Sequence, residues 1–202
     1  QLRQVGFSII PAQTAIALAL GIPHEAVMGL LGAAFVGGTA ALAFLLLAEV
    51  VAATAAVSEG ALVYVARHRN LMLSTLMILV QAALTVGLIL AMPLLPVPPA
   101  QMQAYQAAGA ALALALALGM ASILKARLLG RLLGAPVQGW RWSLIWATAA
   151  ASAVGFGATQ VPEWLELILG IPAILLTFGL VVWYRGFTAE DRMLFRRHKG
   201  EE

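Results

Sequence analysis

Long apolar runs, separated by short polar breaks, make up most of the chain. Six such runs cover residues 5–20, 39–67, 71–92, 104–124, 140–158 and 163–183. A helix rises about 1.5 Å per residue, so about 20 apolar residues cross a bilayer core of about 30 Å. The pattern therefore predicts an all-α, polytopic transmembrane bundle with about six spanning helices.

Glycines and prolines occupy the breaks between these runs. GIPHE at residues 21–25 ends the first run, and four prolines between residues 93 and 99 end the third. Between the first two runs lies a further apolar stretch that is too long to belong to one straight span. The Gly37–Gly38 pair divides it, because paired glycines loosen a helix. We expect residues 27–36 to form a short interfacial helix.

The basic residues lie at alternate ends of the predicted spans. Arg3 precedes the first span, Arg67 and Arg69 follow the second, Lys125, Arg127, Arg131 and Arg141 lie between the fourth and fifth, and five more follow the sixth. Cytoplasmic loops of membrane proteins collect Lys and Arg. With six spans all 12 basic residues fall on one side, so we expect both termini to be cytoplasmic. An odd number of spans would destroy this alternation.

Composition supports a membrane protein with little soluble mass. Hydrophobic residues make up 62% of the chain, charged residues 10%, and the mean hydropathy is +0.93. A soluble domain needs about a quarter charged residues to cover its surface. We expect a transmembrane bundle over residues 1–185 and a charged cytoplasmic tail over residues 186–202. The net charge of +3 comes from short basic clusters at span ends, so we expect no nucleic-acid partner.

Few residues in the chain are suited to catalysis or metal binding. His24, His68 and His198 all fall in predicted breaks or in the tail, Asp191 is the single aspartate, and cysteine is absent. A buried constellation of histidines and acids cannot be built from these positions. No phosphate-binding loop, dinucleotide fingerprint or zinc-protease motif is present. We therefore expect no enzyme, no cofactor and no metal site.

Glu49 is the costly residue of the second span. An ionisable side chain in hydrocarbon costs a few kcal/mol, so Glu49 should not face lipid. One interpretation is a protonatable group in a water-filled cavity, where it couples proton movement to transport or lines the substrate path. The other is a carboxyl group that is neutral, or hydrogen-bonded to Gln or Ser on a neighbouring helix, and holds the bundle together. The sequence leaves both open.

Four further residues are candidates for substrate or coupling roles. Glu59 lies near the cytoplasmic edge, where we favour a carboxylate that snorkels or pairs with a cationic neighbour. Arg67 and Arg69 have side chains able to bind an anionic headgroup or a pyrophosphate, although topology anchors need no ligand. Gln81 would form a helix-to-helix hydrogen bond or line a cavity, and we favour the former.

The fourth span consists almost wholly of Ala, Leu and Gly, which favours close approach between helices. Its extension, KARLLGRLLG from Lys125, places three cations among leucines. We expect this extension to be a basic amphipathic end in the headgroup layer. No Lys or Arg then lies within a predicted span, apart from Arg67 and Arg141 at the ends of two of them.

The order of these features resembles a known family. A span that ends in a basic tripeptide (VYVARHRNLMLS) is followed by a Pro-rich loop and by an Ala-rich span with a basic, Leu-rich end (YQAAGAALALALALGMASILKARLLGRLLG). Together with the tail WYRGFTAEDRMLFRR at residues 183–197, this resembles the C-terminal half of polysaccharide flippases. Those proteins belong to the multidrug/oligosaccharidyl-lipid/polysaccharide exporter superfamily.

The resemblance implies a transporter of about 12 to 14 helices in two related bundles. It would move a lipid-linked oligosaccharide or polysaccharide precursor across the bacterial inner membrane by alternating access. The implied partners are membrane lipid, the lipid-linked saccharide and an N-terminal bundle outside this chain. The resemblance implies a cationic central cavity, from which this half departs because its predicted spans hold no Lys or Arg away from their ends. Two alternatives are an exporter of small amphipathic cations and a non-transporting scaffold of a glycan-assembly complex.

Overall fold

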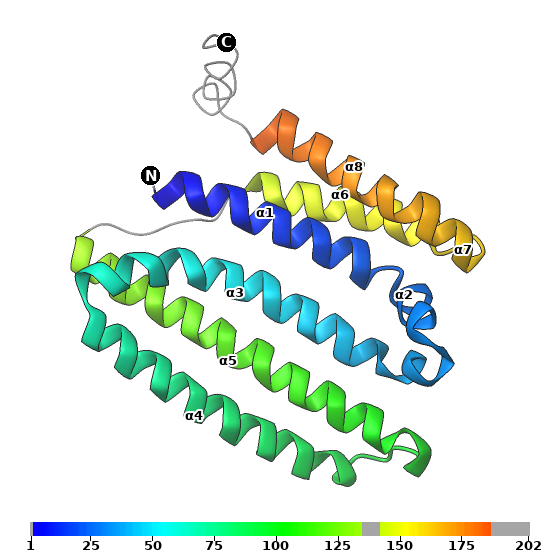
Figure 1. The fold of residues 1–202 in the computed structure, drawn as a ribbon, viewed down its shortest axis with the longest axis horizontal. Helices are drawn as coiled ribbons and strands as arrows, with labels where there is room; N and C mark the ends of the chain where they lie inside the picture. Colours follow the sequence, from blue (N-terminus) through cyan, green and yellow to red (C-terminus); the bar gives the residue numbers. More distant parts are fainter. Residues whose placement is uncertain (1, 135–141, 187–202) are drawn as a thin grey trace.

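A computed structural model describes residues 2–134 and 142–186, and these residues are arranged as helices without a strand (Figure 1). The elements are α1 (Leu2–Gly21), α2 (His24–Leu31), η1 (Ala33–Gly38), α3 (Thr39–Val65), α4 (Arg67–Ala91), η2 (Met92–Leu94), η3 (Pro99–Gln101), α5 (Met102–Leu133), α6 (Trp142–Ala158), α7 (Glu163–Leu165), η4 (Glu166–Gly170), α8 (Ile171–Val181) and η5 (Val182–Gly186). The predicted all-α fold is confirmed for this part of the chain.

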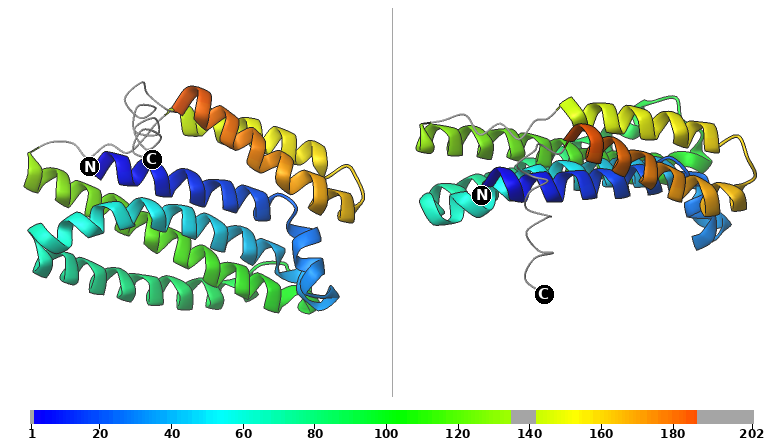
Figure 2. Two further views of the ribbon diagram at one scale, coloured as in Figure 1. Left: turned by 45° about the horizontal axis from the view of Figure 1, so that its top comes forward. Right: turned by 90° about the horizontal axis from the view of Figure 1, so that it is seen from above.

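The long helices lie side by side in two groups of three. In one group α5 packs against both α3 and α4, and in the other α6 and α8 pack against each other and against α1 (Figure 1). Contacts between α1 and α3 join the two groups. Figure 2 shows the same arrangement from two other sides. The two groups therefore meet at a seam formed mainly by α1 and α3, and α2 also contacts both α3 and the segment α7–η4.

Several of these helices are long and apolar enough to cross a membrane. Four pass on length and composition, namely Ala34–Val65, Arg67–Leu94, Pro99–Leu133 and Glu163–Gly186. A fifth is obtained if Ile9–Gly21 and His24–Leu31 count as one span with a bend of 75°. Helix α6 is apolar but has only 17 residues. The described residues thus contain four or five helices that could span a membrane, and the total of six crossings stays a prediction.

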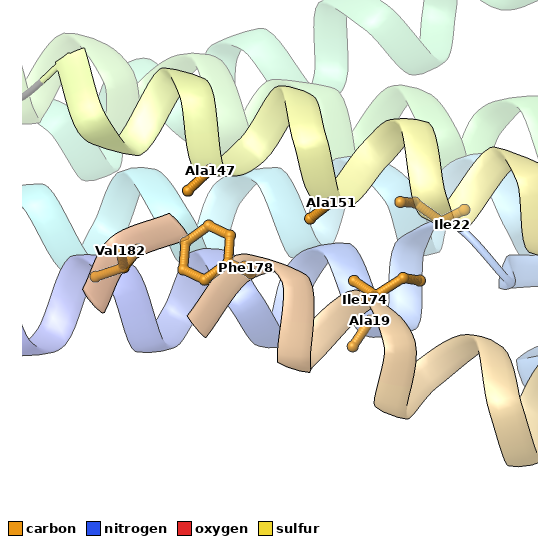
Figure 3. Packing of buried hydrophobic residues seen from close by; sticks show 7 residues of the cluster. All are labelled: Ala19, Ile22, Ala147, Ala151, Ile174, Phe178 and Val182. Atoms are coloured by element: carbon orange, nitrogen blue, oxygen red, sulfur yellow. The ribbon is translucent and has the colours of Figure 1, made fainter. Parts of the chain in front are cut away.

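The group of α1, α6 and α8 has an apolar core. Its buried residues are Ala19, Ile22, Ala147, Ala151, Ile174, Phe178 and Val182 (Figure 3). Alanines on α6 face the larger Ile174 and Phe178 of α8, so small side chains on one helix accommodate large ones on the other. Close packing of this kind is the main source of attraction between helices in lipid.

Helix α5 buries a face of small residues. The buried positions of its first 20 residues are Ala108, Gly109, Ala111, Ala113, Ala115, Ala117 and Ala121. These side chains let α3 and α4 approach α5 closely, in agreement with the expectation for an Ala-rich span.

The segment between α1 and α3 differs from the predicted interfacial helix at residues 27–36. Helix α2 begins earlier, at His24, and ends at Leu31. Gly32 then adopts φ 122°, a conformation that a side chain disfavours, and the 3-10 helix η1 follows. The reason for the break is therefore Gly32, with the Gly37–Gly38 pair marking the later start of α3.

Two helices extend beyond their predicted spans. Helix α4 begins at Arg67 rather than at residue 71, because the chain turns at Ala66 alone, with φ −149° and ψ 54°. Helix α5 continues to Leu133 rather than ending at residue 124. Nothing in KARLLGRLL stops a helix, whereas Gly134 has φ 66°, the left-handed conformation of a helix C-cap. The basic end of this span is therefore part of the same helix.

The last span is irregular at both ends. A π-helical turn at Glu166–Gly170 continues directly into α8, so Pro172 lies inside a continuous helix next to this turn, where its missing N–H removes one helical hydrogen bond. A second π-helical turn, Val182–Gly186, ends the described chain. The predicted fifth span starts at residue 140, which lies outside the described residues together with residue 141. The same holds for the predicted tail beyond Gly186.

Candidate functional site

Glu49 lies near the middle of α3, and its side chain is exposed on the surface of this bundle. Its Oε2 atom accepts a hydrogen bond of 3.4 Å from the Gln13 side-chain amide on α1. This donor–acceptor distance is longer than the most common value for N–H···O hydrogen bonds, which is about 2.9–3.0 Å. The bond nevertheless connects the two groups of helices at their seam. The hydrogen-bonded alternative for Glu49 therefore has a named partner, and that partner lies on a helix of this chain.

The position of Glu49 has an energetic consequence. It is 16 residues, about 24 Å along the helix, from the end of α3 at Val65. A carboxylate at that depth in lipid costs a few kcal/mol, and one hydrogen bond to Gln13 replaces only part of its lost hydration. In a membrane, the surface of the bundle around Glu49 therefore has to contact water or a further polar protein surface rather than lipid.

Glu59 forms an ion pair with Lys125. The Lys125 Nζ atom lies 3.0 Å from Glu59 Oε2 and connects α5 to α3. The lysine side chain is 7% exposed and the glutamate side chain 43%. Of the two arrangements that we favoured for Glu59, the pairing with a cationic neighbour is the one present.

Lys125 is buried, unlike its basic neighbours on α5. Arg127 and Arg131 are exposed, whereas Lys125 is 5% exposed, and the expected position of all three in the headgroup layer stays a prediction. The signal was present in the spacing, because Ala117, Ala121 and Lys125 follow each other at steps of four residues. A helix turns once in 3.6 residues, so positions four apart share a face.

A second polar contact joins α3 and α5 toward the middle of the bundle. Thr54 Oγ1 and Ser122 Oγ are 2.6 Å apart. The Thr54 hydroxyl donates its one hydrogen to the Val51 carbonyl oxygen at 2.7 Å, so Ser122 is the donor between the two side chains. Ser122 and Lys125 thus tie α5 to α3 at two levels.

Two buried polar atoms on α4 have no hydrogen-bond partner among the described residues. They are Asn70 Oδ1 and Ser74 Oγ. The two residues are four apart and so lie on one face of α4, and Asn70 is only 6% exposed. Buried polar atoms are nearly always satisfied in folded proteins. This pair therefore needs an explanation.

The remaining predicted site residues are not brought together. Arg67 and Arg69 are exposed in the first turn of α4, and Gln81 is half-buried further along that helix. No hydrogen bond or ion pair connects these three to another described residue. The candidate set from the sequence thus separates into Glu49 with Gln13, Glu59 with Lys125, and three residues whose roles the contacts do not indicate.

The opposite end of the bundle holds a buried acid that sequence reasoning missed. Glu166 is 7% exposed, and electrostatic interactions connect it with His24, Glu163 and Glu25. Within residues 2–134 and 142–186, no three His, Asp or Glu side chains are placed to hold a metal ion. The signal was available, because Glu166 is an acid inside the predicted span at residues 163–183, as Glu49 is inside the second span.

No protein-family model, curated protein or solved structure matches this chain.

Proposed function

We propose that this chain is one helical bundle of a bacterial inner-membrane exporter that moves a lipid-linked oligosaccharide or polysaccharide precursor by alternating access. The resemblance of its ordered features to the C-terminal half of polysaccharide flippases supports this assignment. The partners are membrane lipid, the lipid-linked saccharide and a second helical bundle outside this chain. The chain transports and does not catalyse a covalent step.

The observation that carries the proposal is the exposed carboxyl group of Glu49 in the middle of α3. A group that is too costly to face lipid, and that lies on the outside of this bundle, belongs on the wall of a hydrated path or against the second bundle. Substrate and coupling sites of transporters lie near the bilayer midplane, between two such bundles. Glu49 lies about 24 Å along α3 from Val65, which puts it past the midplane toward the outer side of such a site.

A cation within the bundle also supports the proposal. Lys125 is buried inside the bundle, whereas Arg127 and Arg131 of the same candidate span, Pro99–Leu133, are exposed. The resemblance implies cationic groups that face the interior of the membrane part. Lys125 is a candidate for such a group, although the Glu59 carboxylate balances its charge in this arrangement.

The proposed topology has six crossings with both ends in the cytoplasm. The crossings are α1, α3, α4, α5, α6 and the stretch from α7 to η5. Successive long helices run in alternating directions, and the described chain starts and stops at the same end of the bundle (Figure 1). Arg67, Arg69 and Arg131 lie at that end, where the positive-inside rule places the cytoplasm.

The test is Glu49→Gln in the full-length protein, with Glu25→Gln as the matched control. The substitution removes the charge and keeps the size of the side chain. We expect polymer export to fall by at least about tenfold, the equivalent of 1.4 kcal/mol in the transport barrier, with an altered pH dependence. The control should export normally, because Glu25 is exposed on the short helix α2. Unchanged export and pH dependence in Glu49→Gln would refute the role of Glu49.

Two other outcomes would assign a different function. Loss of resistance to small amphipathic cations, with normal polymer export, would indicate a drug exporter, for which an exposed intramembrane acid is equally suited. The contact between Glu49 and Gln13 is what a non-transporting scaffold would need. In that case Glu49→Gln and Gln13→Ala would weaken the bundle to the same extent, and neither would change the transport of any substrate.

A further inference from the structure

A group of acidic and histidine side chains lies at the end of the bundle opposite Arg67. His24 and Glu25 begin α2, and Glu163 and Glu166 begin α7 and η4. Helix α2 belongs to the segment between α1 and α3, yet it contacts both α7 and η4 (Figure 1). This contact joins the two groups of helices at a second place, apart from the packing of α1 on α3.

Glu166 is the buried member of this group, with 7% of its surface exposed. A Cβ atom at Gly170 would lie 3.5 Å from Glu166 Cγ and 3.1 Å from Ala158 Cβ, so the stem of Glu166 runs along η4 on the side of α6. A buried carboxylate is costly unless a positive group compensates for its lost hydration. The question is which neighbour supplies that charge.

His24 is the described neighbour of Glu166 that can become positive. The electrostatic neighbours of Glu166 are His24, Glu163 and Glu25, and the two acids repel it. The Glu163 carboxylate itself lies against α2, because a Cβ atom at Gly29 would be 4.0 Å from Glu163 Oε2. The proton on His24 therefore decides whether charges across this contact attract or only repel.

The contacts of His24 indicate which ring nitrogen titrates. Its Nδ1 atom lies 2.9 Å from the carbonyl oxygen of Ile22. A carbonyl oxygen only accepts, so Nδ1 carries a hydrogen in the neutral ring and Nε2 gains or loses the second proton. The ring is half-buried, so water still reaches it. Imidazole is the side chain that ordinarily changes charge between about pH 5 and 8.

The surrounding elements contribute no further charge to this contact. The elements packed against α2 and η4 are α1, η1, α3, α6, α7 and α8. Within these described elements, Asp, Glu, Lys, Arg, His and Tyr are absent from η1, α6 and α8, from α1 after Arg3, and from α3 before Glu49. Glu49 is ten residues, about 15 Å, from the start of α3. The balance of charge thus depends on His24 and the three acids.

We propose that His24, Glu163 and Glu166 form a proton-controlled clamp between α2 and the segment α7–η4. With a proton on Nε2, the imidazolium of His24 attracts the carboxylates and holds α2 against η4. When that proton passes to water, Glu25, Glu163 and Glu166 repel one another across the contact, and α2 separates from η4. The proposal does not depend on what the bundle transports.

The sign of the pH dependence follows from this arrangement. Nearby carboxylates favour the protonated form of His24 in the closed contact, so protonation favours closure by linkage. The clamp therefore holds while His24 is charged and weakens as the pH rises through its titration. It also weakens in acid once Glu166 takes up a proton, because the imidazolium then has less negative charge to attract.

The test measures the separation of α2 from α7 in the complete chain. The sequence has no cysteine, so Leu30→Cys and Trp164→Cys, at positions 74% and 62% exposed, accept one nitroxide label each. His68→Gln and His198→Gln leave His24 as the single histidine. We expect pulsed electron paramagnetic resonance to show the ratio of close to separated forms falling at least about fivefold between about pH 6 and 8.5.

Variants of the clamp distinguish charge from packing. His24→Lys remains charged over this pH range and should keep the close form throughout, whereas His24→Gln should favour the separated form throughout. Glu166→Gln should reduce the response to pH, because a buried partner of the imidazolium is lost. The matched control is Gln160→Ala, an exposed polar residue between α6 and α7, which should keep the full response.

Three results would overturn the proposal. One is a ratio of close to separated forms that does not change with pH while His24 is present. Another is a His24→Gln chain that keeps the full response, and the third is a His24→Lys chain that loses the close form as the pH rises. The first measurement changes no residue of the clamp, so it decides the matter even where a clamp variant fails to fold.

Discussion

At the scale of single residues, the polar groups of this bundle act in pairs that cross between helices. Lys125 with Glu59, Ser122 with Thr54, and Gln13 with Glu49 each connect different helices. A charge buried in a low-dielectric interior is tolerated when a partner compensates for its lost hydration. Reversing the sign of one partner should therefore cost far more than removing an exposed charge nearby.

Lys125→Glu is the first prediction at this scale, with Arg127→Glu as its control. Two carboxylates would then meet where one ion pair stood, so we expect the folded yield to collapse, with a loss of about 3 kcal/mol or more. Arg127 is exposed on the same helix, and its reversal should change stability by less than about 0.5 kcal/mol. Purified yield and Tm in detergent measure both. Equal behaviour of the two variants would contradict the burial of Lys125.

At the scale of helices, α3 and α5 form the central pair of their group. Their contacts advance in the same direction along both helices, from Thr54 with Ser122 to Glu59 with Lys125, so the two helices are parallel. Helix α4 lies between them in the sequence and runs antiparallel to both. The Ala-rich face of α5 makes this approach close, and the polar contacts set its register.

A disulfide between α3 and α5 tests this register. The hydroxyl oxygens of Thr54 and Ser122 are 2.6 Å apart, which puts their Cβ atoms near the separation of about 3.5–4.5 Å that a disulfide needs. The chain contains no cysteine, so Thr54→Cys with Ser122→Cys gives one defined pair. We expect rapid cross-linking by a mild oxidant, seen as a shift in gel mobility after cleavage between the helices. Thr54→Cys with Ile123→Cys, which is exposed on the next position, should cross-link poorly.

The packing of α6 against its neighbours gives a second prediction for a pair of helices. A Cβ atom at Gly155 would lie 2.6 Å from Ile22 Cδ1 and 3.0 Å from Ile174 Cδ1. Overpacking of this kind costs about 1–3 kcal/mol. We therefore expect Gly155→Ala to lower Tm. Gly157→Ala on the same helix meets no atom within 4 Å, and should raise Tm or leave it unchanged, because Ala favours helix over Gly. A loss of equal size at both positions would argue against this helix contact.

At the scale of the whole molecule, two groups of three helices meet at a seam. Helices α1 and α3 form most of that seam, and Gln13 and Glu49 meet across it. These two side chains make the outer surface of the seam polar in the middle of an otherwise apolar bundle. This is the place on the bundle where a second bundle or a hydrated path would relieve the cost of the carboxyl group.

The six-crossing topology can be tested with single cysteines in the same cysteine-free chain. Leu95→Cys lies between α4 and α5, and Val161→Cys between α6 and α7. We expect both to react in intact cells with a maleimide that does not cross the inner membrane. His68→Cys, exposed in the first turn of α4, should react only after the membrane is opened. A His68→Cys that reacts as fast as Leu95→Cys in intact cells would rule out the proposed orientation.

Much of the helical architecture follows from the sequence for a simple reason. A run of about 20 apolar residues has one stable form in a bilayer, because every backbone N–H and C=O must then bond within the segment. Helices near the predicted positions are accordingly present, such as α3 starting at Thr39 after the Gly37–Gly38 pair. The ends of the helices were less predictable. The chain turns at Ala66, although alanine is not a residue that usually ends a helix, and α5 continues nine residues beyond the apolar run before Gly134 ends it.

The partners of the charged residues were decided by the tertiary structure. From the sequence, Glu49 and Glu59 are costly residues without known partners, and Lys125 reads as one more cation at a cytoplasmic edge. Which face of a helix is buried depends on which other helices pack against it, and a nearly uniform apolar composition does not encode that choice. Only the packing of α5 between α3 and α4 reveals that Lys125 is internal, and that Asn70 and Ser74 on α4 have buried oxygens without a described partner.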